Sequence, residues 1–144
     1  MSVTVDVNVL LYASDESSAF HAKARGLVER LARGPDLLYL FWPVVMGYLR
    51  IATHPSIFPR PLSVEAATAN MGQLLSRSHT RAPGEGESFW QVYGAATSRV
   101  VVRGNLVPDA HLVSLMRENG VGTLWTHDLD FRKFEDIRAR DPFA

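Results

Sequence analysis

The chain has 144 residues, 47% of them hydrophobic, and a formal net charge of zero, as expected for one globular domain spanning residues 1–144. It contains no cysteine, which excludes disulfide bonds and thiolate metal sites. No apolar run approaches the roughly 20 residues of a membrane span, and the first residues lack the basic start of a signal peptide. We therefore expect a cytoplasmic protein with no membrane partner.

Strand and helix patterns alternate along the chain. Short runs rich in β-branched and apolar residues predict strands, and longer segments with apolar residues three and four positions apart predict helices. In chain order, the predicted elements are a strand at 3–6, a helical turn at 9–12, a helix at 17–33, a strand at 37–42, helices at 43–53 and 63–78, a connector at 79–86 with room for one short strand, helices at 87–102 and 108–119, a strand at 121–125, and a last turn with a short edge strand within 131–144. Ser17 or Ser18 is a candidate N-cap for the helix at 17–33, and Ser63 for the helix at 63–78.

This alternation predicts an α/β fold with a mostly parallel central sheet of four to five strands and helices on both faces. Ligands bind such sheets beyond the carboxyl ends of the strands. Four acids fall where that edge is expected: Asp6 ends the first strand, Asp109 lies in the first turn of a helix, and Asp128 and Asp130 follow the strand at 121–125.

Any one of these acids has an ordinary structural explanation, as a strand end, a helix first-turn residue or a turn former. Carboxylates gathered at one edge repel one another, however, and each loses hydration. A hard cation such as Mg²⁺ or Mn²⁺ removes both penalties and prefers oxygen ligands. Such ions can activate water for phosphodiester cleavage.

Several segments carry a family resemblance when they are taken in order. They are D-V-N-V-L-L-Y-A at 6–13, W-P at 42–43, L-R-I-A-T-H-P with I-F within 49–58, R-G-N-L-V-P-D-A-H-L at 103–112, and T-H-D-L-D-F-R-K-F at 126–134. Together they resemble PIN-domain ribonuclease toxins of the VapC type, the toxin half of VapBC toxin–antitoxin pairs. The resemblance extends over essentially the whole chain.

The resemblance implies the toxin component of a type II toxin–antitoxin system. Such a toxin is a Mg²⁺- or Mn²⁺-dependent endoribonuclease, usually a homodimer, and a cognate VapB-type antitoxin blocks it. RNA is the implied substrate, with tRNA as one candidate. The residues that correspond by position are Asp6, Asp109 and Asp128 as catalytic metal-site acids, Asp130 as a further metal ligand, and Asn8 and Thr126 as supporting polar residues.

One position departs from the family pattern. The family usually has Glu on the helix after the second strand, and this chain has Gly47 there. Three explanations remain open: a weakened or inactive relative, a variant made tolerable to its host, or compensation by Asp130. The competing function is therefore a catalytically inactive PIN-fold protein that binds antitoxin or RNA without cleaving. Cleavage of RNA by purified protein with Mg²⁺ or Mn²⁺ distinguishes the two.

Other aromatic residues receive structural explanations. The tryptophans have apolar neighbours, so we expect them in the core rather than as stacking platforms for RNA bases. The histidines lack the spacing of metal ligands, and we expect them at the surface or in packing. These residues are Trp42, Trp90, Trp125, His54, His111 and His127.

Overall fold

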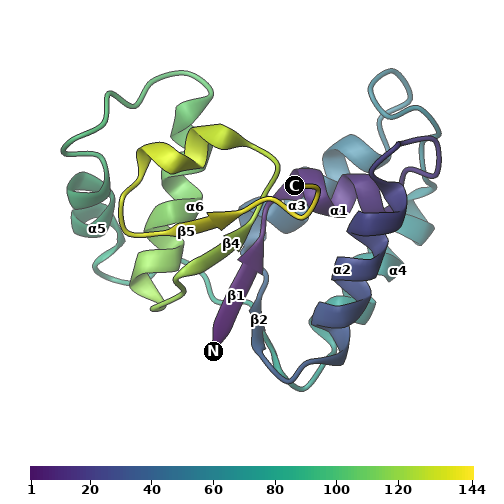
Figure 1. The fold of residues 1–144 in the computed structure, drawn as a ribbon, viewed down its shortest axis with the longest axis horizontal. Helices are drawn as coiled ribbons and strands as arrows, with labels where there is room; N and C mark the ends of the chain where they lie inside the picture. Colours follow the sequence, from purple (N-terminus) through teal and green to yellow (C-terminus); the bar gives the residue numbers. More distant parts are fainter.

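A five-stranded, fully parallel sheet forms the centre of the molecule (Figure 1). The computed structural model describes all 144 residues. Its strands are β1 (Ser2–Val5), β2 (Leu37–Tyr39), β3 (Thr80–Arg81), β4 (Thr123–Trp125) and β5 (Arg138–Arg140), in the spatial order β3-β2-β1-β4-β5. The register pairs Val5 of β1 with Trp125 of β4. The central strand and its neighbour therefore end at the same level, and the predicted parallel sheet is confirmed.

Helices cover both sides of this sheet. They are α1 (Val7–Ala13), α2 (His21–Arg33), α3 (Trp42–Ala52), α4 (Val64–Leu75), α5 (Phe89–Ala96), α6 (Leu106–Glu118) and a short 3-10 helix, η1 (Leu129–Lys133). In Figure 1, α1, α2 and α4 lie to one side of the sheet, and α5 and α6 lie to the other. This arrangement confirms the predicted α/β class. None of the helices has the length and apolar character that crossing a membrane requires.

Burial of β1 on both faces explains its central place. Val3, Thr4 and Val5 are all at most 4% exposed, although successive side chains of a strand point to opposite faces. The one polar member, Thr4, donates its hydroxyl hydrogen to the carbonyl of Tyr39 at 2.7 Å. A buried hydroxyl without such a partner would cost free energy, so the bond makes this position compatible with the core.

The predicted start of the second helix is wrong, because α2 begins at His21 and not near residue 17. The two serines that were candidate caps form turns instead. Ser17 donates to the Asp15 carboxylate from its amide at 3.1 Å and from its hydroxyl at 2.6 Å. Ser18 Oγ accepts from the amide of Phe20 at 3.1 Å. These local bonds offer the backbone an alternative to a helix. The predicted cap at Ser63 is confirmed, since Ser63 Oγ accepts from the amide of Ala66.

The predicted helix at 87–102 is also too long, because α5 ends at Ala96. The hydroxyls of Thr97 and Ser98 donate to the carbonyls of Tyr93 and Ala95 at 2.8 and 2.9 Å, which satisfies the last turn. The three consecutive valines at 100–102 follow, and their branched side chains are restricted in helices. The helix therefore stops before them.

The expectation that the tryptophans are core residues is wrong for two of the three. Trp90 is 75% exposed and Trp42 is 39% exposed, while Trp125 is partly buried. Trp90 lies on the outer face of α5 and stacks in parallel on Tyr93, with ring centroids 5.7 Å apart. Trp42 donates its indole N–H to the carbonyl of Ala82 at 3.1 Å. Apolar sequence neighbours did not reveal which face of each helix is outward.

Candidate metal centre

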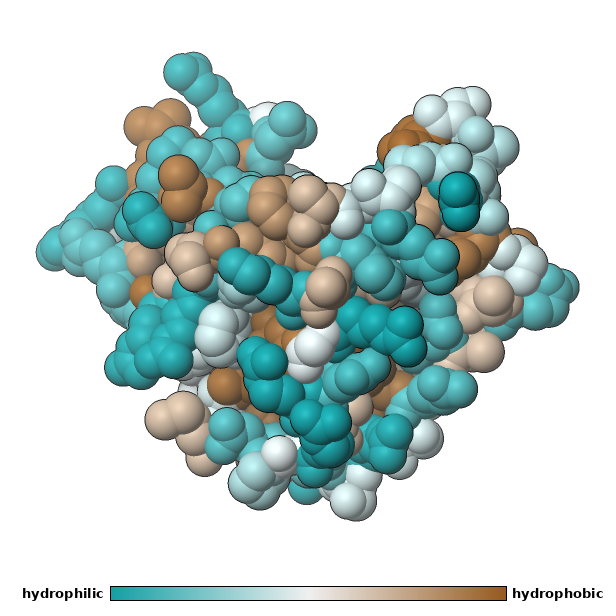
Figure 2. All heavy atoms as spheres, turned by 45° about the vertical axis from the view of Figure 1, so that its right-hand side comes forward, coloured by the Kyte–Doolittle hydropathy of each residue, from teal (hydrophilic) through white to brown (hydrophobic).

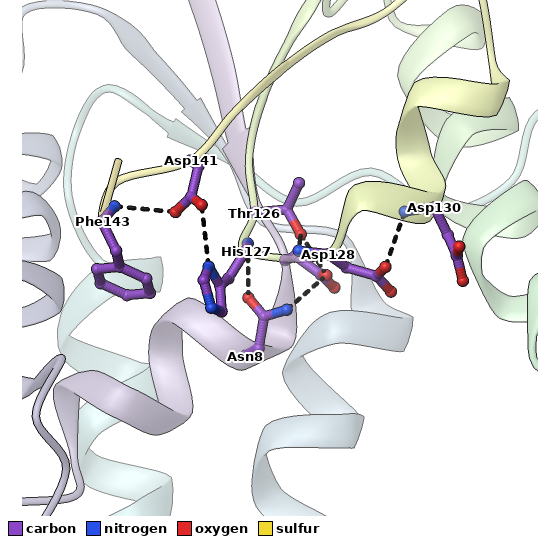
Figure 3. Close-up of polar contacts among 8 residues, drawn as sticks. Asn8, Thr126, His127, Asp128, Asp130, Asp141 and Phe143 are labelled. Atoms are coloured by element: carbon purple, nitrogen blue, oxygen red, sulfur yellow. Dashed lines mark hydrogen bonds and ion pairs between the residues drawn. The ribbon is translucent and has the colours of Figure 1, made fainter.

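Three carboxylates from two segments meet at the carboxyl edge of the sheet. Asp109 lies in the first turn of α6, Asp128 follows β4 and caps η1, and Asp130 lies in η1. One ligand oxygen from each lies within 4.8 Å of the other two. Figure 3 shows Asp128 and Asp130 on the segment after β4, where the Asp130 amide donates to Asp128 Oδ1 at 2.9 Å. We call Asp109, Asp128 and Asp130 the acidic trio.

Asp6 adjoins the acidic trio but is not part of it. It directly follows β1 and is the N-cap of α1, where its Oδ1 accepts from the amide of Val7 at 2.8 Å. Its Oδ2 accepts from Thr126 Oγ1 at 2.9 Å and from Asn8 Nδ2 at 3.2 Å. From the sequence we expected Asp6, Asp109 and Asp128 as catalytic acids and Asp130 as a further metal ligand. The amide of Asp130 donates to Asp128 Oδ1, so η1 holds Asp130 beside Asp128 and Asp109, while Asp6 lies next to this group.

Both residues expected to support the site contact Asp6. The Thr126 side chain is buried, and its hydroxyl donates to Asp6 and accepts from the amide of Asp128 at 2.9 Å. Asn8 donates to Asp6, and its Oδ1 lies 3.5 Å from the amide of His127. Thr126 thus connects the end of β1 to the loop after β4, and it holds two of the acids in fixed relation.

Two carboxylates of this site, Asp109 and Asp6, have raised pKa values. Burial raises the pKa of Asp109 to about 7, and the charges of Asp128, Asp6 and Asp130 add to the rise, while Lys133 opposes it. Burial also raises the pKa of Asp6, against the hydrogen bonds from Thr126 and Val7, and the charge of Asp128 adds to the rise. Lys133 Nζ lies 3.6 Å from Asp130 Oδ1. Four acids with one nearby lysine leave a negative edge that a cation would stabilise.

Gly47 lies on α3, and no residue of that helix is acidic. A Cβ placed on Gly47 would meet only Val7 Cγ2, at the ordinary contact distance of 3.5 Å. Val7 directly follows Asp6, so a side chain at position 47 would start beside the Asp6 end of the site. The backbone therefore has room for a Cβ at position 47.

Sequence reasoning missed Asp141 and Phe143 near the site, and it expected His127 only at the surface or in packing. His127 Nδ1 lies 3.0 Å from Asp141 Oδ2, and the amide of Phe143 donates to Asp141 Oδ1 at 2.9 Å (Figure 3). Burial raises the pKa of Asp141, but the hydrogen bonds from Phe143 and His127 outweigh it and lower the pKa overall. No pattern in the sequence pairs Asp141 with His127, because they lie on different segments that only the fold brings together.

No family model matches the chain, but relatives match over its full length. Ribonuclease VapC48 of Mycobacterium tuberculosis is 56% identical over 144 residues, which is 100% of this chain and 99% of that protein. Two solved structures share the fold. VapBC2 from Rickettsia felis, bound to a DNA fragment from its promoter, has a TM-score of 0.69 at 15% identity, covering 97% of this chain and 98% of that one. VapC20 of M. tuberculosis, a toxin that cleaves the sarcin–ricin loop, has a TM-score of 0.67 at 20% identity, covering 94% of this chain and 98% of that one. The chain therefore belongs to the VapC family of PIN-domain ribonucleases.

Proposed function

We propose that this protein is the toxin component of a type II toxin–antitoxin system and acts as a metal-dependent endoribonuclease that cleaves RNA phosphodiester bonds. The observation that carries the proposal is the acidic trio beside Asp6, at the edge of the sheet where α/β proteins bind ligands. Its place in a chain 56% identical to a ribonuclease supports the same chemistry.

The donor set fits Mg²⁺ or Mn²⁺. The acidic trio offers carboxylate oxygens with no thiolate or imidazole among them, and hard divalent ions prefer such ligands. We assign Asp6, Asp109 and Asp128 as the catalytic acids, and Asp130 as a further ligand. When bound, the ion supplies the positive charge that polarises a phosphodiester and its attacking water.

The chain's own residues determine the geometry of the site. Thr126 and the amide of Val7 fix both oxygens of Asp6, so this carboxylate stays ordered before RNA arrives. Lys133 lies beside Asp130 and can approach a phosphate oxygen. In Figure 2, a notch separates two lobes at the top of the molecule, the side toward which β1 runs in Figure 1. A strand of RNA would reach the acids from this side.

The catalytically inactive alternative has less support. Its basis is Gly47, and the loss of one acid on α3 leaves Asp6 and the acidic trio in place. We infer that the missing carboxylate weakens metal binding rather than abolishing it. Lower ligand charge reduces affinity for a hard cation.

The proposed partners are RNA, a VapB-type antitoxin and a second copy of the chain. The R. felis structure is a VapBC complex, and here a groove of about 480 Å³ runs between α1, α2 and α4. Its apolar lining would suit an antitoxin segment; it includes Leu10, Val28, Leu62, Met71 and Leu74. Exposed apolar side chains near α5, such as Trp90 and Val101, offer surface for a homodimer. The RNA could be tRNA or another structured RNA.

The deciding experiment compares RNA cleavage by the parent, Asp128→Asn and Asp36→Asn, each purified without antitoxin. Asp36 is an exposed acid before β2, so its variant is a matched control. We expect cleavage by the parent and the control with Mg²⁺ or Mn²⁺, and none with a chelator or with Asp128→Asn. Cleavage that survives either treatment would come from another nuclease or another site, and would contradict the proposal.

A further inference from the structure

The segment after β5 folds back onto the loop that carries Asp128. β5 ends at Arg140, whose carbonyl accepts from the amide of Thr126 at 2.9 Å. The next residue, Asp141, uses both carboxylate oxygens. One accepts from the amide of Phe143, and the other lies 3.0 Å from His127 Nδ1. An ionised carboxylate only accepts hydrogen bonds, so His127 Nδ1 carries the donated hydrogen.

Aromatic rings also pack against the side chain of His127, which is partly exposed. The ring of Phe143 stacks on Phe20 with centroids 4.4 Å apart, and it meets Tyr12 edge-on at 5.5 Å. The His127 ring lies 4.9 Å from Phe20 and 5.1 Å from Phe143. The imidazole is therefore held by a hydrogen bond at one nitrogen and by packing on two rings, which leaves it few alternative rotamers.

His127 lies between two residues of the candidate metal centre. Thr126 precedes it and contacts Asp6, while Asp128 follows it in the acidic trio. The backbone amide of His127 has only one contact of its own, at 3.5 Å to Asn8 Oδ1, which is at the long limit for a hydrogen bond. The side chain of His127 is therefore the better anchored part of this residue.

We propose that Asp141 and Phe143 are positioning residues that hold His127, and through it set the direction of the Asp128 carboxylate toward a bound ion. The inference rests on the proposed function, since it assumes that Asp128 is a ligand. Residues that orient metal ligands without touching the ion typically change metal affinity by about 10- to 100-fold when they are mutated. Because Asp141 acts through one intervening residue, we expect an effect at the lower end, about tenfold.

The test measures Mn²⁺ affinity of folded protein in two pairs of variants. Asp141→Ala removes both acceptors, whereas Asp141→Asn keeps one. His127→Phe keeps a ring but removes the donor, whereas His127→Asn keeps a donor near the Nδ1 position and removes the ring. We expect about tenfold weaker Mn²⁺ binding for Asp141→Ala and His127→Phe, and intermediate losses for the two Asn variants.

The matched control is His79→Phe. His79 Nε2 lies 2.8 Å from the carbonyl of Leu31, and it precedes β3 at the amino edge of the sheet, opposite the acids. This variant should lower the unfolding temperature and leave Mn²⁺ affinity at the parental value. If Asp141→Ala behaves like His79→Phe, losing stability but not metal affinity, then Asp141 is only structural and the proposal is overturned.

A measurement without metal separates this proposal from the proposed function. The amide of Asp128 donates to Thr126, and its hydrogen exchange in metal-free protein should be faster in Asp141→Ala and His127→Phe than in the parent or His79→Phe. Unchanged exchange would overturn the positioning role. A parent that binds no Mn²⁺, or an Asp128→Asn variant that binds it as well as the parent, would overturn the proposed function, while the exchange data would still decide whether Asp141 orders this loop.

Discussion

Replacing Asp109 with Asn should stabilise the metal-free protein, and more so at alkaline pH. Folding raises the pKa of Asp109 from 3.8 to about 7, so the folded protein holds a proton that the unfolded chain releases. The free energy of unfolding therefore falls as the pH rises from about 4 to about 7, because the unfolded state binds fewer protons in this window. Above pH 7 Asp109 is ionised in the folded protein, and its desolvation and its repulsion by the other acids lower the free energy of unfolding by their full amount. Asn has the same size and no charge, so it avoids this cost.

The size of the effect follows from the shift. The pKa of Asp109 rises by about three, and at 1.36 kcal/mol for each pKa unit this corresponds to roughly 4 kcal/mol of unfolding free energy. That figure is an upper bound because Asp109 is only partly buried, and solvent screens its repulsion from the other acids. We expect a gain of about 1–2 kcal/mol for Asp109→Asn at pH 8, and a smaller gain at pH 5, where the parent still holds the proton.

The assay is urea unfolding with a chelator at both pH values, on the parent, Asp109→Asn and Asp36→Asn. Saturating Mn²⁺ should then stabilise the parent more than Asp109→Asn, since the ion binds the folded state and the variant lacks one charge. The reasoning is refuted if Asp109→Asn is no more stable than the parent at pH 8, or if Asp36→Asn gains as much.

Three further outcomes are expected. Gly47→Glu should bind Mn²⁺ more tightly and cleave RNA faster than Gly47→Ala. Both variants remove the cost of a glycine within a helix, about 0.5–1 kcal/mol, but only Glu adds a carboxylate near Asp6. Equal Mn²⁺ affinities of the two variants would show that position 47 does not reach the site. Thr126→Val should lower the free energy of unfolding, measured in urea, by about 1–3 kcal/mol, because the Asp6 carboxylate and the Asp128 amide each lose a hydrogen-bond partner. Thr126→Ser should keep most of the parental stability. A Val variant as stable as the parent would disprove the bridging role. RNA binding by Asp128→Asn, followed by fluorescence anisotropy, should weaken as salt rises; binding insensitive to salt would argue against phosphate contacts.

Local chemistry made the sheet and the position of the acids predictable. The β-branched run at the start of the chain and the segment that ends at Trp125 form short, largely buried strands. Because these two strands are parallel neighbours, an acid after each lies at the shared carboxyl edge. The membership of the acidic trio depends on how tightly η1 turns after Asp128, and alternation of strands and helices does not determine that turn. The contact of Asp141 with His127 depends on where the chain runs after β5. Neither spacing nor composition encodes it.

The capping role of Asp6 limits how a toxin of this design can be moderated. The carboxylate that belongs to the active edge also starts α1 and anchors the buried Thr126, so replacing it would loosen the fold along with the chemistry. Position 47 has no such structural role, because glycine has no side chain to cap a helix or bind a neighbour, and a Cβ added there would meet only Val7 Cγ2 at an ordinary contact distance. A change at position 47 would therefore alter the charge of the site while the cap of α1 and the bond from Thr126 to Asp6 stay in place.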